Sequence, residues 1–500
     1  MDYSVAASQM LTYVLDERGE ETLTSFLYGQ IRHDIQSGHL QAGQKLPSKR
    51  KLAKHLGISV ITVEAAYVQL VSEGYLVARP RSGFFVVDLG IGGNGIADRL
   101  PIATPACATN IRPNTLDLGK SSASTGRAQI KTSIDLATNT MPIGVFPYKT
   151  WAKTLRDVLA SNSERTIIDQ VDPFGSEILR AQIAQYLRSW RGMDVDPNNI
   201  VVAAGSQTLY YLLIQLLGRH RIFAVEDPGY PRLTDIYRTN DVHLAHVPLD
   251  SNGIRVDLLS LMGADVAHVM PSHQFPTGVV TSISRRYELL AWASQAQDHV
   301  LVEDDYDAEF RLAGKPIPTL FGMDTTQSVV YINTFSQSLG GIFRIGYMVL
   351  PPLLAQEFRE RLSFYSGTVS AIEQLTLARF IETGAYGRHI NRLRCAYRNI
   401  RDELLVGLKE SSIASVVKVS GEDAGLHFEL ELDLDVPTGD LVAAVARRGV
   451  QLVPMANFYQ KLDDSKERCR FVLNYGSLKS ESIPTVIAAL EESVHEVAEI

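Results

Sequence analysis

The sequence predicts two folded units of different class: a small winged helix-turn-helix near the N-terminus and a large α/β domain with a mostly parallel sheet. Three observations predict them. Two short helical patterns joined at Gly57 precede a hairpin pattern. From Ile130 onward, β-rich runs alternate with helical patterns. The chain has 500 residues, too many for one simple core.

A stretch rich in glycine, proline, serine and threonine separates the two units. We therefore place the first unit at residues 22–88, a linker at 89–129 and the second unit at 130–500. A smaller C-terminal α/β subdomain is expected at about residues 370–500.

The cysteine content and the apolar pattern limit the classes of protein to which the chain can belong. The three cysteines, Cys107, Cys395 and Cys469, are far apart, so neither a disulfide framework nor a metal site is expected. No apolar run approaches the ~20 residues that cross a membrane. The N-terminus lacks the basic start and apolar stretch of a signal peptide. We expect a cytoplasmic protein without a membrane partner.

The first unit begins with two short helices. Ser48 is a suitable N-cap for the first, and Gly57 supplies a left-handed end. Ser59 is a suitable N-cap for the second, whose apolar face would carry Val63, Tyr67, Leu70 and Val71. Such a pair is a helix-turn-helix, and its second helix would place Ser59 and Thr62 nearest the bases in a major groove.

A β-hairpin with a basic tip is expected next. The runs Tyr75–Ala78 and Phe84–Val87 flank Arg79–Gly83, which would form a wing. Residues 29–81 hold eight Lys/Arg against three acids, a net charge of +5, whereas the whole chain carries −8. A local basic patch on an acidic protein is typical of a specific DNA-binding module. The candidate DNA contacts are Lys49, Arg50, Ser59, Thr62, Tyr67, Arg79, Arg81, Ser82 and Gly83.

The segment from Leu27 to Leu76 resembles the GntR class of winged helices, which implies a double-stranded DNA operator as partner. Val60-Ile61 stands where that class often has a polar or basic pair. If these side chains face DNA, they read shape or a thymine methyl group, so the operator sequence does not transfer. The alternative is a small helical module for protein interaction, but the order helix, turn, helix, wing favours DNA.

Separated motifs mark the second unit: Asp172–Gly175 followed by Leu179-Arg180, Gly205–Gln207, Glu226–Arg232, Pro271–Gly278, Glu303–Asp307, Thr334–Ser338 and Arg344–Tyr347. Together they resemble the aminotransferase-like domain of MocR-type regulators (the GabR-like group). The resemblance covers residues 130–500 and implies an aminotransferase fold of type I. Each motif alone is weak, and their joint order carries the resemblance.

The motifs also fit the chemistry of pyridoxal phosphate, which needs a phosphate cup and an anion at its pyridine nitrogen. Gly205–Gln207 (Gly205, Ser206, Gln207) would follow a strand and begin a helix, where backbone N–H groups receive phosphate. Asp304 would lie at the end of an apolar strand and supply the anion at the pyridine nitrogen. Tyr306, two residues further along the chain, would hydrogen-bond to the hydroxyl group of the cofactor ring. The resemblance adds cofactor contacts at Tyr230, Ser336, Ser338 and Arg344, and ligand-carboxylate contacts at Arg232 and Arg470.

One departure decides the expected chemistry. The resemblance implies a lysine between Ser336 and Ser338, but the chain has Gln337. An amide is neither nucleophilic nor basic near neutral pH, so Gln337 can neither bind the cofactor covalently nor move its protons. We expect no catalytic residue and negligible transamination. Pyridoxal 5'-phosphate or a related B6 vitamer is expected to bind non-covalently, if at all. Alternatively, the pocket binds something else or nothing, or Gln337 is an engineered change.

The leading hypothesis is a one-component transcription regulator in which a small-molecule effector alters the spacing of two winged helices. The resemblance implies a head-to-tail, domain-swapped homodimer, which the linker 89–129 is long enough to allow. Two rivals stay open. One is a working aminotransferase with an accessory DNA-binding domain, which Gln337 disfavours. The other is a dead pocket retained as a dimerisation scaffold.

Overall fold

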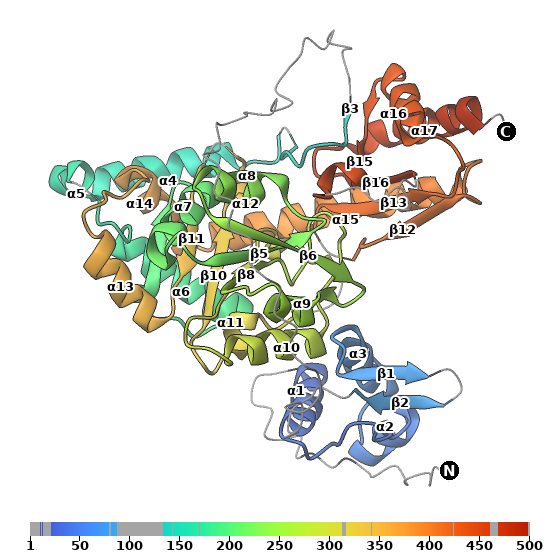
Figure 1. Cartoon of the computed structure of the whole chain (residues 1–500), viewed down its shortest axis with the longest axis horizontal. Coiled ribbons are helices and arrows are strands. Elements are labelled where there is room, and N and C mark those ends of the chain that lie inside the picture. Colours follow the sequence, from blue (N-terminus) through green and yellow to red (C-terminus); the bar gives the residue numbers. More distant parts are fainter. Residues whose placement is uncertain are drawn as a thin grey trace, which may run out of the picture.

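The computed structural model describes residues 11, 13, 22–79, 82–87, 134–142, 144–169, 171–312, 317–341, 343–423, 425–460 and 469–498. It confirms the predicted fold class: a winged helix, a large α/β domain and a C-terminal subdomain (Figure 1). The predicted linker at 89–129 and the wing residue Arg81 lie outside the described residues.

The winged helix contains α1 (Leu23–Gln36), α2 (Lys49–Leu56), α3 (Val60–Ser72), β1 (Leu76–Arg79) and β2 (Gly83–Val86). Its caps are those that the sequence predicts. The Ser48 and Ser59 hydroxyls accept hydrogen bonds from the backbone N–H groups of Lys51 and Thr62, at 3.3 and 3.0 Å. Gly57 ends α2 with φ +67°, a left-handed conformation that favours glycine.

The apolar face of α3 forms the core of this unit. Val63, Tyr67 and Leu70 are fully buried against α1 and the hairpin. The Tyr67 hydroxyl donates a 2.9 Å hydrogen bond to the carbonyl of Pro47. Tyr67 as a DNA contact is therefore wrong: it lies on the inner face of α3, where it fixes the start of α2.

The hairpin is antiparallel, with Leu76 opposite Val86 and Arg79 opposite Gly83. Lys45 forms an isolated antiparallel bridge with Phe85. The guanidinium of Arg79 lies 4.7 Å from the centre of the Phe85 ring, so the hairpin carries a cation–π contact next to its turn.

The large domain is built on an eight-stranded sheet in the order β4-β11-β10-β9-β8-β5-β6-β7. The pairs from β10 through β9, β8 and β5 to β6 are parallel, while β11 and β7 run antiparallel to their neighbours. The strands are β4 (Ile200–Ala203), β5 (Ile222–Asp227), β6 (His243–Asp250), β7 (Gly253–Ile254), β8 (Val266–Val269), β9 (Val300–Asp304), β10 (Val329–Thr334) and β11 (Gly346–Val349).

Helices cover both faces of this sheet, so its central strands are apolar on both sides. On β4, Val201 and Ala203 pack with one set of helices, and Ile200 and Val202 with the other. The first set is α7 (Ser206–Leu217), α8 (Pro231–Thr239) and α13 (Pro352–Leu362). The opposite face carries α6 (Glu177–Arg191), α9 (Val256–Leu261), α10 (Ile283–Ala293), α11 (Leu320–Met323) and α14 (Ala371–Glu382).

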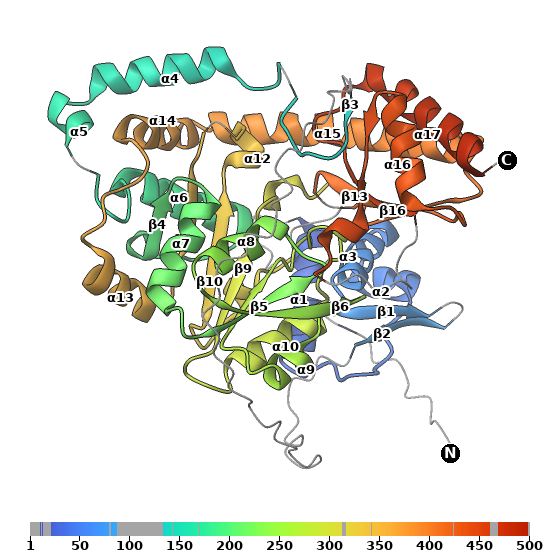
Figure 2. The ribbon, with the colours of Figure 1, turned by 45° about the horizontal axis from the view of Figure 1, so that its top comes forward.

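Two helices near the start of this unit lie outside the sheet layers. Helix α4 (Tyr148–Ser161) packs along α14, and the short α5 (Glu164–Ile168) follows it (Figure 2). Helix α12 (Ser336–Leu339) follows β10. Among the described residues, no helix combines the length and the apolar character that a bilayer crossing requires.

The C-terminal subdomain has a four-stranded antiparallel sheet in the order β12-β13-β16-β15. Its elements are α15 (Ala385–Glu410), β12 (Val417–Ser420), β13 (His427–Leu432), α16 (Thr438–Arg447), β14 (Val450–Gln451), β15 (Val453–Pro454), β16 (Cys469–Asn474) and α17 (Ile483–Ala498). Strand β14 pairs with β3 (Ile134–Asp135), so a segment from the start of the second unit lies in this subdomain. The sequence did not indicate that pairing.

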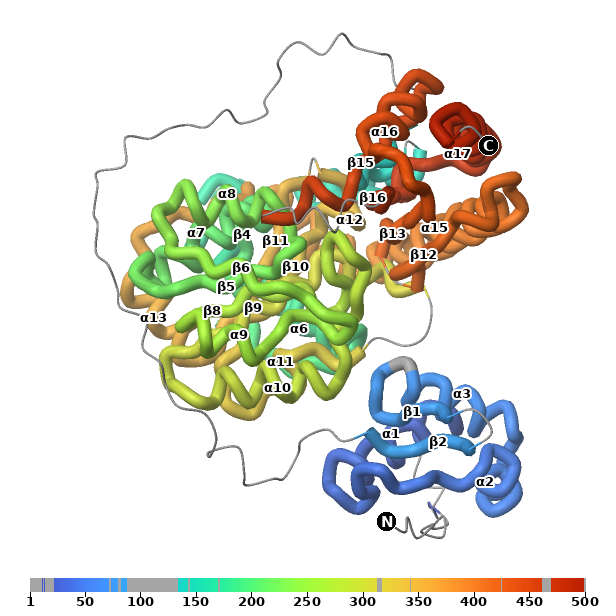
Figure 3. The backbone as a smooth tube through the Cα atoms, turned by 45° about the vertical axis from the view of Figure 1, so that its right-hand side comes forward, coloured from blue at the N-terminus to red at the C-terminus, as the bar shows by residue number. Residues whose placement is uncertain are grey.

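The winged helix contacts the large domain at α10 (Figures 1 and 3). Ile283, the first residue of α10, is fully buried in the core cluster of the winged helix. A Cβ atom on Gly74 would lie 3.4 Å from the Ile283 side chain, which shows how closely the two units approach.

Candidate functional site

Most of the candidate DNA contacts lie at the starts of α2 and α3 and on the hairpin. Arg50, Ser59 and Ser82 are exposed, Thr62 and Gly83 are half-buried, and Lys49 forms an ion pair with Glu64. The two residues that depart from the GntR pattern, Val60 and Ile61, are 41% and 78% exposed. Apolar side chains this open at the start of a recognition helix can contact thymine methyl groups.

In the large domain, Asp304 is the last residue of β9 and lies at the carboxyl end of the parallel sheet, where α/β proteins bind ligands. The Tyr210 hydroxyl donates a hydrogen bond to Oδ2 of Asp304, and Nε2 of His268 lies 3.4 Å from the same oxygen. The Tyr237 hydroxyl in turn lies 2.6 Å from Nδ1 of His268. Oδ1 of Asp304 is buried and has no hydrogen-bond partner among the described residues.

The predicted phosphate cup lies between β4 and α7. Gly205 has φ +81°, and α7 begins at Ser206, so the first backbone N–H groups of this twelve-residue helix are available to an anion. A Cβ atom on Gly205 would lie 2.8 Å from a guanidinium nitrogen of Arg344. The structure thus brings Arg344 to the cup. Ser206 is half-buried and Gln207 is exposed.

Tyr230 and Arg232 lie at the start of α8. The Tyr230 ring contacts Phe275 edge-on, with 5.8 Å between ring centres. Burial raises the pKa of the Tyr230 hydroxyl, so the ring stays neutral. Arg232 is exposed in the first turn of the helix.

The three residues of the predicted lysine motif form the start of α12. Ser336 and Gln337 are half-buried. Ser338 is fully buried: its hydroxyl donates to the carbonyl of Phe335 at 3.1 Å and accepts from Tyr386 at 3.0 Å. Ser338 therefore anchors α12 to α15, which is a role that the sequence did not indicate.

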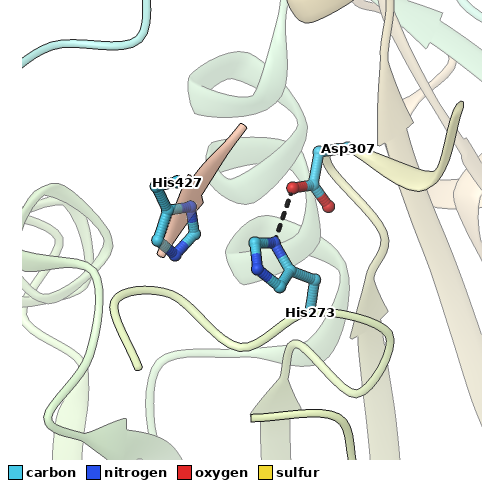
Figure 4. A group of neighbouring side chains, drawn as sticks. All are labelled: His273, Asp307 and His427. Atoms are coloured by element: carbon cyan, nitrogen blue, oxygen red, sulfur yellow. Dashed lines mark hydrogen bonds and ion pairs between the residues drawn. The ribbon is translucent and has the colours of Figure 1, made fainter. Parts of the chain in front are cut away.

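Tyr306 meets a buried cluster that the sequence did not predict. Its hydroxyl lies 3.2 Å from Nδ1 of His273, which also lies 2.7 Å from a carboxylate oxygen of Asp307. The His427 ring centre is 4.3 Å from that of His273 (Figure 4). A ligand atom from each of His273, Asp307 and His427 lies within 4.8 Å of the others, the spacing of a metal site.

The charges around this cluster disfavour a cation. Arg191 and Arg311 line the small cavity that His273 and Asp307 also line. We read His273 and Asp307 as a hydrogen-bonded support for Tyr306.

Arg470 lies on β16 and is paired rather than free. Its Nε donates to Glu429 of β13, and Tyr459 adjoins the same guanidinium. Both Arg470 and Glu429 line a cavity between the large domain and the C-terminal subdomain.

Sequence reasoning missed Tyr210, His268 and Glu429. His268 carried one signal, since it is a polar residue inside the apolar run of β8. Tyr210 and Glu429 carried none, because their partners lie 94 and 41 residues away along the chain.

Comparisons with known proteins agree with both units. Residues 23–86 match the family described as bacterial regulatory proteins, gntR family, and residues 131–472 match aminotransferase class I and II. The chain is 34% identical to the HTH-type transcriptional regulator YdeL of Bacillus subtilis, over 87% of this chain and 89% of that one. It is 30% identical to the probable rhizopine catabolism regulatory protein MocR of Rhizobium meliloti, over 89% and 88% of the two chains.

A further relative matches nearly the whole chain, and a solved structure matches most of it. The HTH-type pyridoxine biosynthesis transcriptional regulator PdxR of Corynebacterium glutamicum is 29% identical, over 97% of this chain and 98% of that one. The multiple substrate aminotransferase from Thermococcus profundus superposes with a TM-score of 0.65 at 25% identity, covering 73% of this chain and 93% of that one.

Proposed function

Since the chain belongs to the MocR-type transcriptional regulators, DNA-binding proteins that join a GntR winged helix to an aminotransferase-like domain, we propose that its large domain is a sensor that binds a B6 vitamer without a covalent link. Three features support this proposal: the buried Asp304 carboxylate with an oxygen that is unpaired among the described residues, the Gly205 turn beside Arg344, and a glutamine where the family has its lysine.

Two features of the pocket support the fit of pyridoxal phosphate. Oδ1 of Asp304 is a buried acceptor with no partner among the described residues, as a protonated pyridine nitrogen would require. Gly205 has a φ of +81°, which other residues rarely adopt, and a Cβ atom there would lie 2.8 Å from the Arg344 guanidinium, so glycine favours an open cup. Both features are independent of Gln337.

The chain's own residues would hold the ligand as follows. The N–H groups that begin α7, together with Arg344, would bind the phosphate. Asp304, held by Tyr210 and His268, would keep a proton on the ring nitrogen. Tyr230 would cover one face of the ring. When bound, pyridoxal phosphate supplies an electron sink for reactions of amino acids.

Gln337 would allow the vitamer to bind but would not support transamination. Its amide can donate and accept hydrogen bonds, but it has no basic nitrogen near neutral pH. Binding by Asp304 and the phosphate cup would therefore continue without proton transfer at position 337. We propose that the ligand acts as a signal rather than as a cofactor, and that it changes the affinity of the winged helix for DNA.

The experiment combines both units in one sample. DNA fragments that the full-length protein retains from a random library would be footprinted with and without pyridoxal phosphate. We expect a protected site whose affinity changes when the vitamer is added. A site that is protected equally at every vitamer concentration would support the scaffold alternative. Release of keto acid over many turnovers from added amino acids would support the enzyme alternative.

A further inference from the structure

Helix α3 presents an apolar stripe to solvent on the side opposite its buried face. Ile61, Ala65 and Val68 stand at intervals of four and three residues, so they share one side of the helix. All three are exposed, Ile61 at 78%. Val60, which is 41% exposed, adjoins the stripe in the first turn. The outer side of a surface helix is usually polar, so this stripe indicates a surface that contacts another molecule.

The polar side chains of α3 that the structure describes are buried or have partners within the winged helix. The helix contains no lysine, arginine or asparagine, which are among the side chains that most often read guanine and adenine. Tyr67 and Gln69 are buried. The Thr62 hydroxyl lies 2.8 Å from the hydroxyl of the N-cap, and Glu64 is paired with Lys49. Apolar contact is therefore the means of base recognition that α3 offers.

Cations on both sides of α3 indicate DNA rather than an apolar protein as the partner of this stripe. Helix α2 and strand β1 both pack against α3. Arg50, Lys51 and Lys54 are exposed on α2, and Arg79 is exposed on β1. A duplex would pair these cations with phosphates at the edges of its major groove while α3 lies within the groove. An apolar protein surface would leave them without anionic partners.

We propose that Val60 and Ile61 read the operator through the C5-methyl groups of thymine, and that Ala65 extends this contact into the second turn of α3. The inference rests on the DNA-binding half of the proposed function and names the base that α3 selects. Thymine is the base that presents a methyl group in the major groove, so an apolar side chain can select it without a hydrogen bond. Ile61 and Ala65 lie about 6 Å apart along the helix axis. They therefore span about two base-pair steps of about 3.4 Å each.

Recognition of DNA shape is the competing explanation for a helix without donors. Shape is read by cations in a narrow minor groove or through the energy of bending the duplex. Neither mechanism uses an apolar side chain in the major groove, and the exposed cation of the hairpin, Arg79, would serve shape recognition without α3. The two mechanisms differ in one observable. Uracil in place of thymine removes the methyl group and keeps the base pair, so it weakens apolar contact specifically.

The test replaces thymine by uracil in a duplex that the full-length protein selects from a random library. Each thymine is replaced in turn, and the affinity is measured by fluorescence anisotropy. At two or more neighbouring positions the affinity is expected to fall about fourfold for each lost methyl group, and about tenfold or more when two are lost together. No loss at any position, or the same small loss at every position, would overturn the inference. So would selected sequences that share no thymine.

A substitution in the protein assigns the contact to α3. In Ile61→Ala the ratio of affinities for the thymine and uracil duplexes is expected to fall towards one at the position that Ile61 contacts. Ile61 is 78% exposed, so this variant is expected to fold, which thermal unfolding checks. Val406→Ala, at a residue that is 51% exposed on α15, is the matched control and should keep the fourfold ratio. A ratio that is unchanged in both Ile61→Ala and Val60→Ala would overturn the inference.

The remaining outcomes separate this inference from the sensor proposal and from a protein interface. A preference for thymine in a protein whose DNA affinity ignores the vitamer would support this inference and refute the sensor. Equal affinity for the thymine and uracil duplexes, together with an effect of the vitamer, would refute this inference alone. If the stripe is a protein interface, Ile61→Ala changes the sedimentation coefficient of the DNA-free protein and uracil has no effect, which also overturns the inference.

Discussion

The side-chain amide of Gln36, the last residue of α1, donates a 3.0 Å hydrogen bond to the hydroxyl of Tyr287 in the large domain. The same amide nitrogen lies 3.0 Å from the Tyr75 hydroxyl. Gln36 thus joins the hairpin and first helix of the DNA-binding unit to α10. Together with Ile283, which is buried in the core of the winged helix, this contact connects the large domain directly to the winged helix.

Replacing Ile283 by alanine should loosen this contact. Ile283 is fully buried within the winged-helix core, and removing such a side chain costs roughly 2 to 5 kcal/mol. Hydrogen–deuterium exchange should rise in α10 and in α1, while the central strands keep their protection. Leu261→Ala, at a residue that is 79% exposed on α9, is the matched control. Unchanged exchange in Ile283→Ala would show that the two units do not depend on each other.

DNA affinity should depend on Arg50 and not on Tyr67. Arg50→Ala removes an exposed cation at the start of α2 and should weaken binding and lower its salt dependence. Tyr67→Phe removes the buried hydrogen bond to Pro47, which costs about 1 kcal/mol of stability. Its DNA affinity should stay at the level of the parent wherever the protein is folded. Fluorescence anisotropy at several salt concentrations measures the DNA affinity of both variants. A loss of affinity in Tyr67→Phe but not in Arg50→Ala would contradict the placement of Arg50 on the DNA-binding face.

Stability should fall with rising pH because of Glu226. Burial raises the pKa of its carboxyl to about 8, above the usual 4.5, so the folded protein keeps a proton that the unfolded chain loses. Its contribution to stability is complete below pH 4.5 and is lost as the pH rises to 8, at up to about 1.4 kcal/mol per pH unit. The free energy of unfolding, measured with urea at pH 6, 7 and 8, should fall less steeply with pH in Glu226→Gln than in the parent protein. The same dependence on pH in both proteins would refute the prediction.

Vitamer binding should depend on the charge of Asp304. In Asp304→Asn the ring nitrogen loses its anionic partner, so affinity for pyridoxal phosphate should fall by about tenfold or more. Absorbance titration measures this loss. Tyr148→Phe, at a residue that is 70% exposed on α4, is a control with no expected effect. Equal affinities for Asp304→Asn and the parent would place the ring elsewhere.

Much of the winged helix could be predicted from sequence, because its signals are local. Ser48, Gly57 and Ser59 mark ends of α2 and α3 through bonds that span three or four residues. Tyr67 shows the limit of such reasoning. The apolar pattern placed it correctly on the inner face of α3, and its place among the candidate DNA contacts is contradicted by its burial and its bond to Pro47.

Residues of the proposed pocket could be predicted from the sequence only where they lie at the end of a strand. Asp304 and Gly205 lie at the carboxyl ends of β9 and β4, positions that a strand pattern reveals. Partners from distant segments could not be predicted, as for Glu429 with Arg470. The pairing of β3 with β14 was hidden for the same reason, because more than 300 residues separate the two strands.

The most direct test of the account is the visible spectrum of the full-length protein after incubation with pyridoxal phosphate, read before and after dialysis. We expect saturable binding that dialysis removes, and no cofactor attached to any peptide after borohydride treatment. In Gln337→Lys the absorbance should survive dialysis, since the restored amine can hold the cofactor covalently. Absorbance that survives dialysis in the parent protein, with a borohydride-trapped peptide from the large domain, would contradict the account.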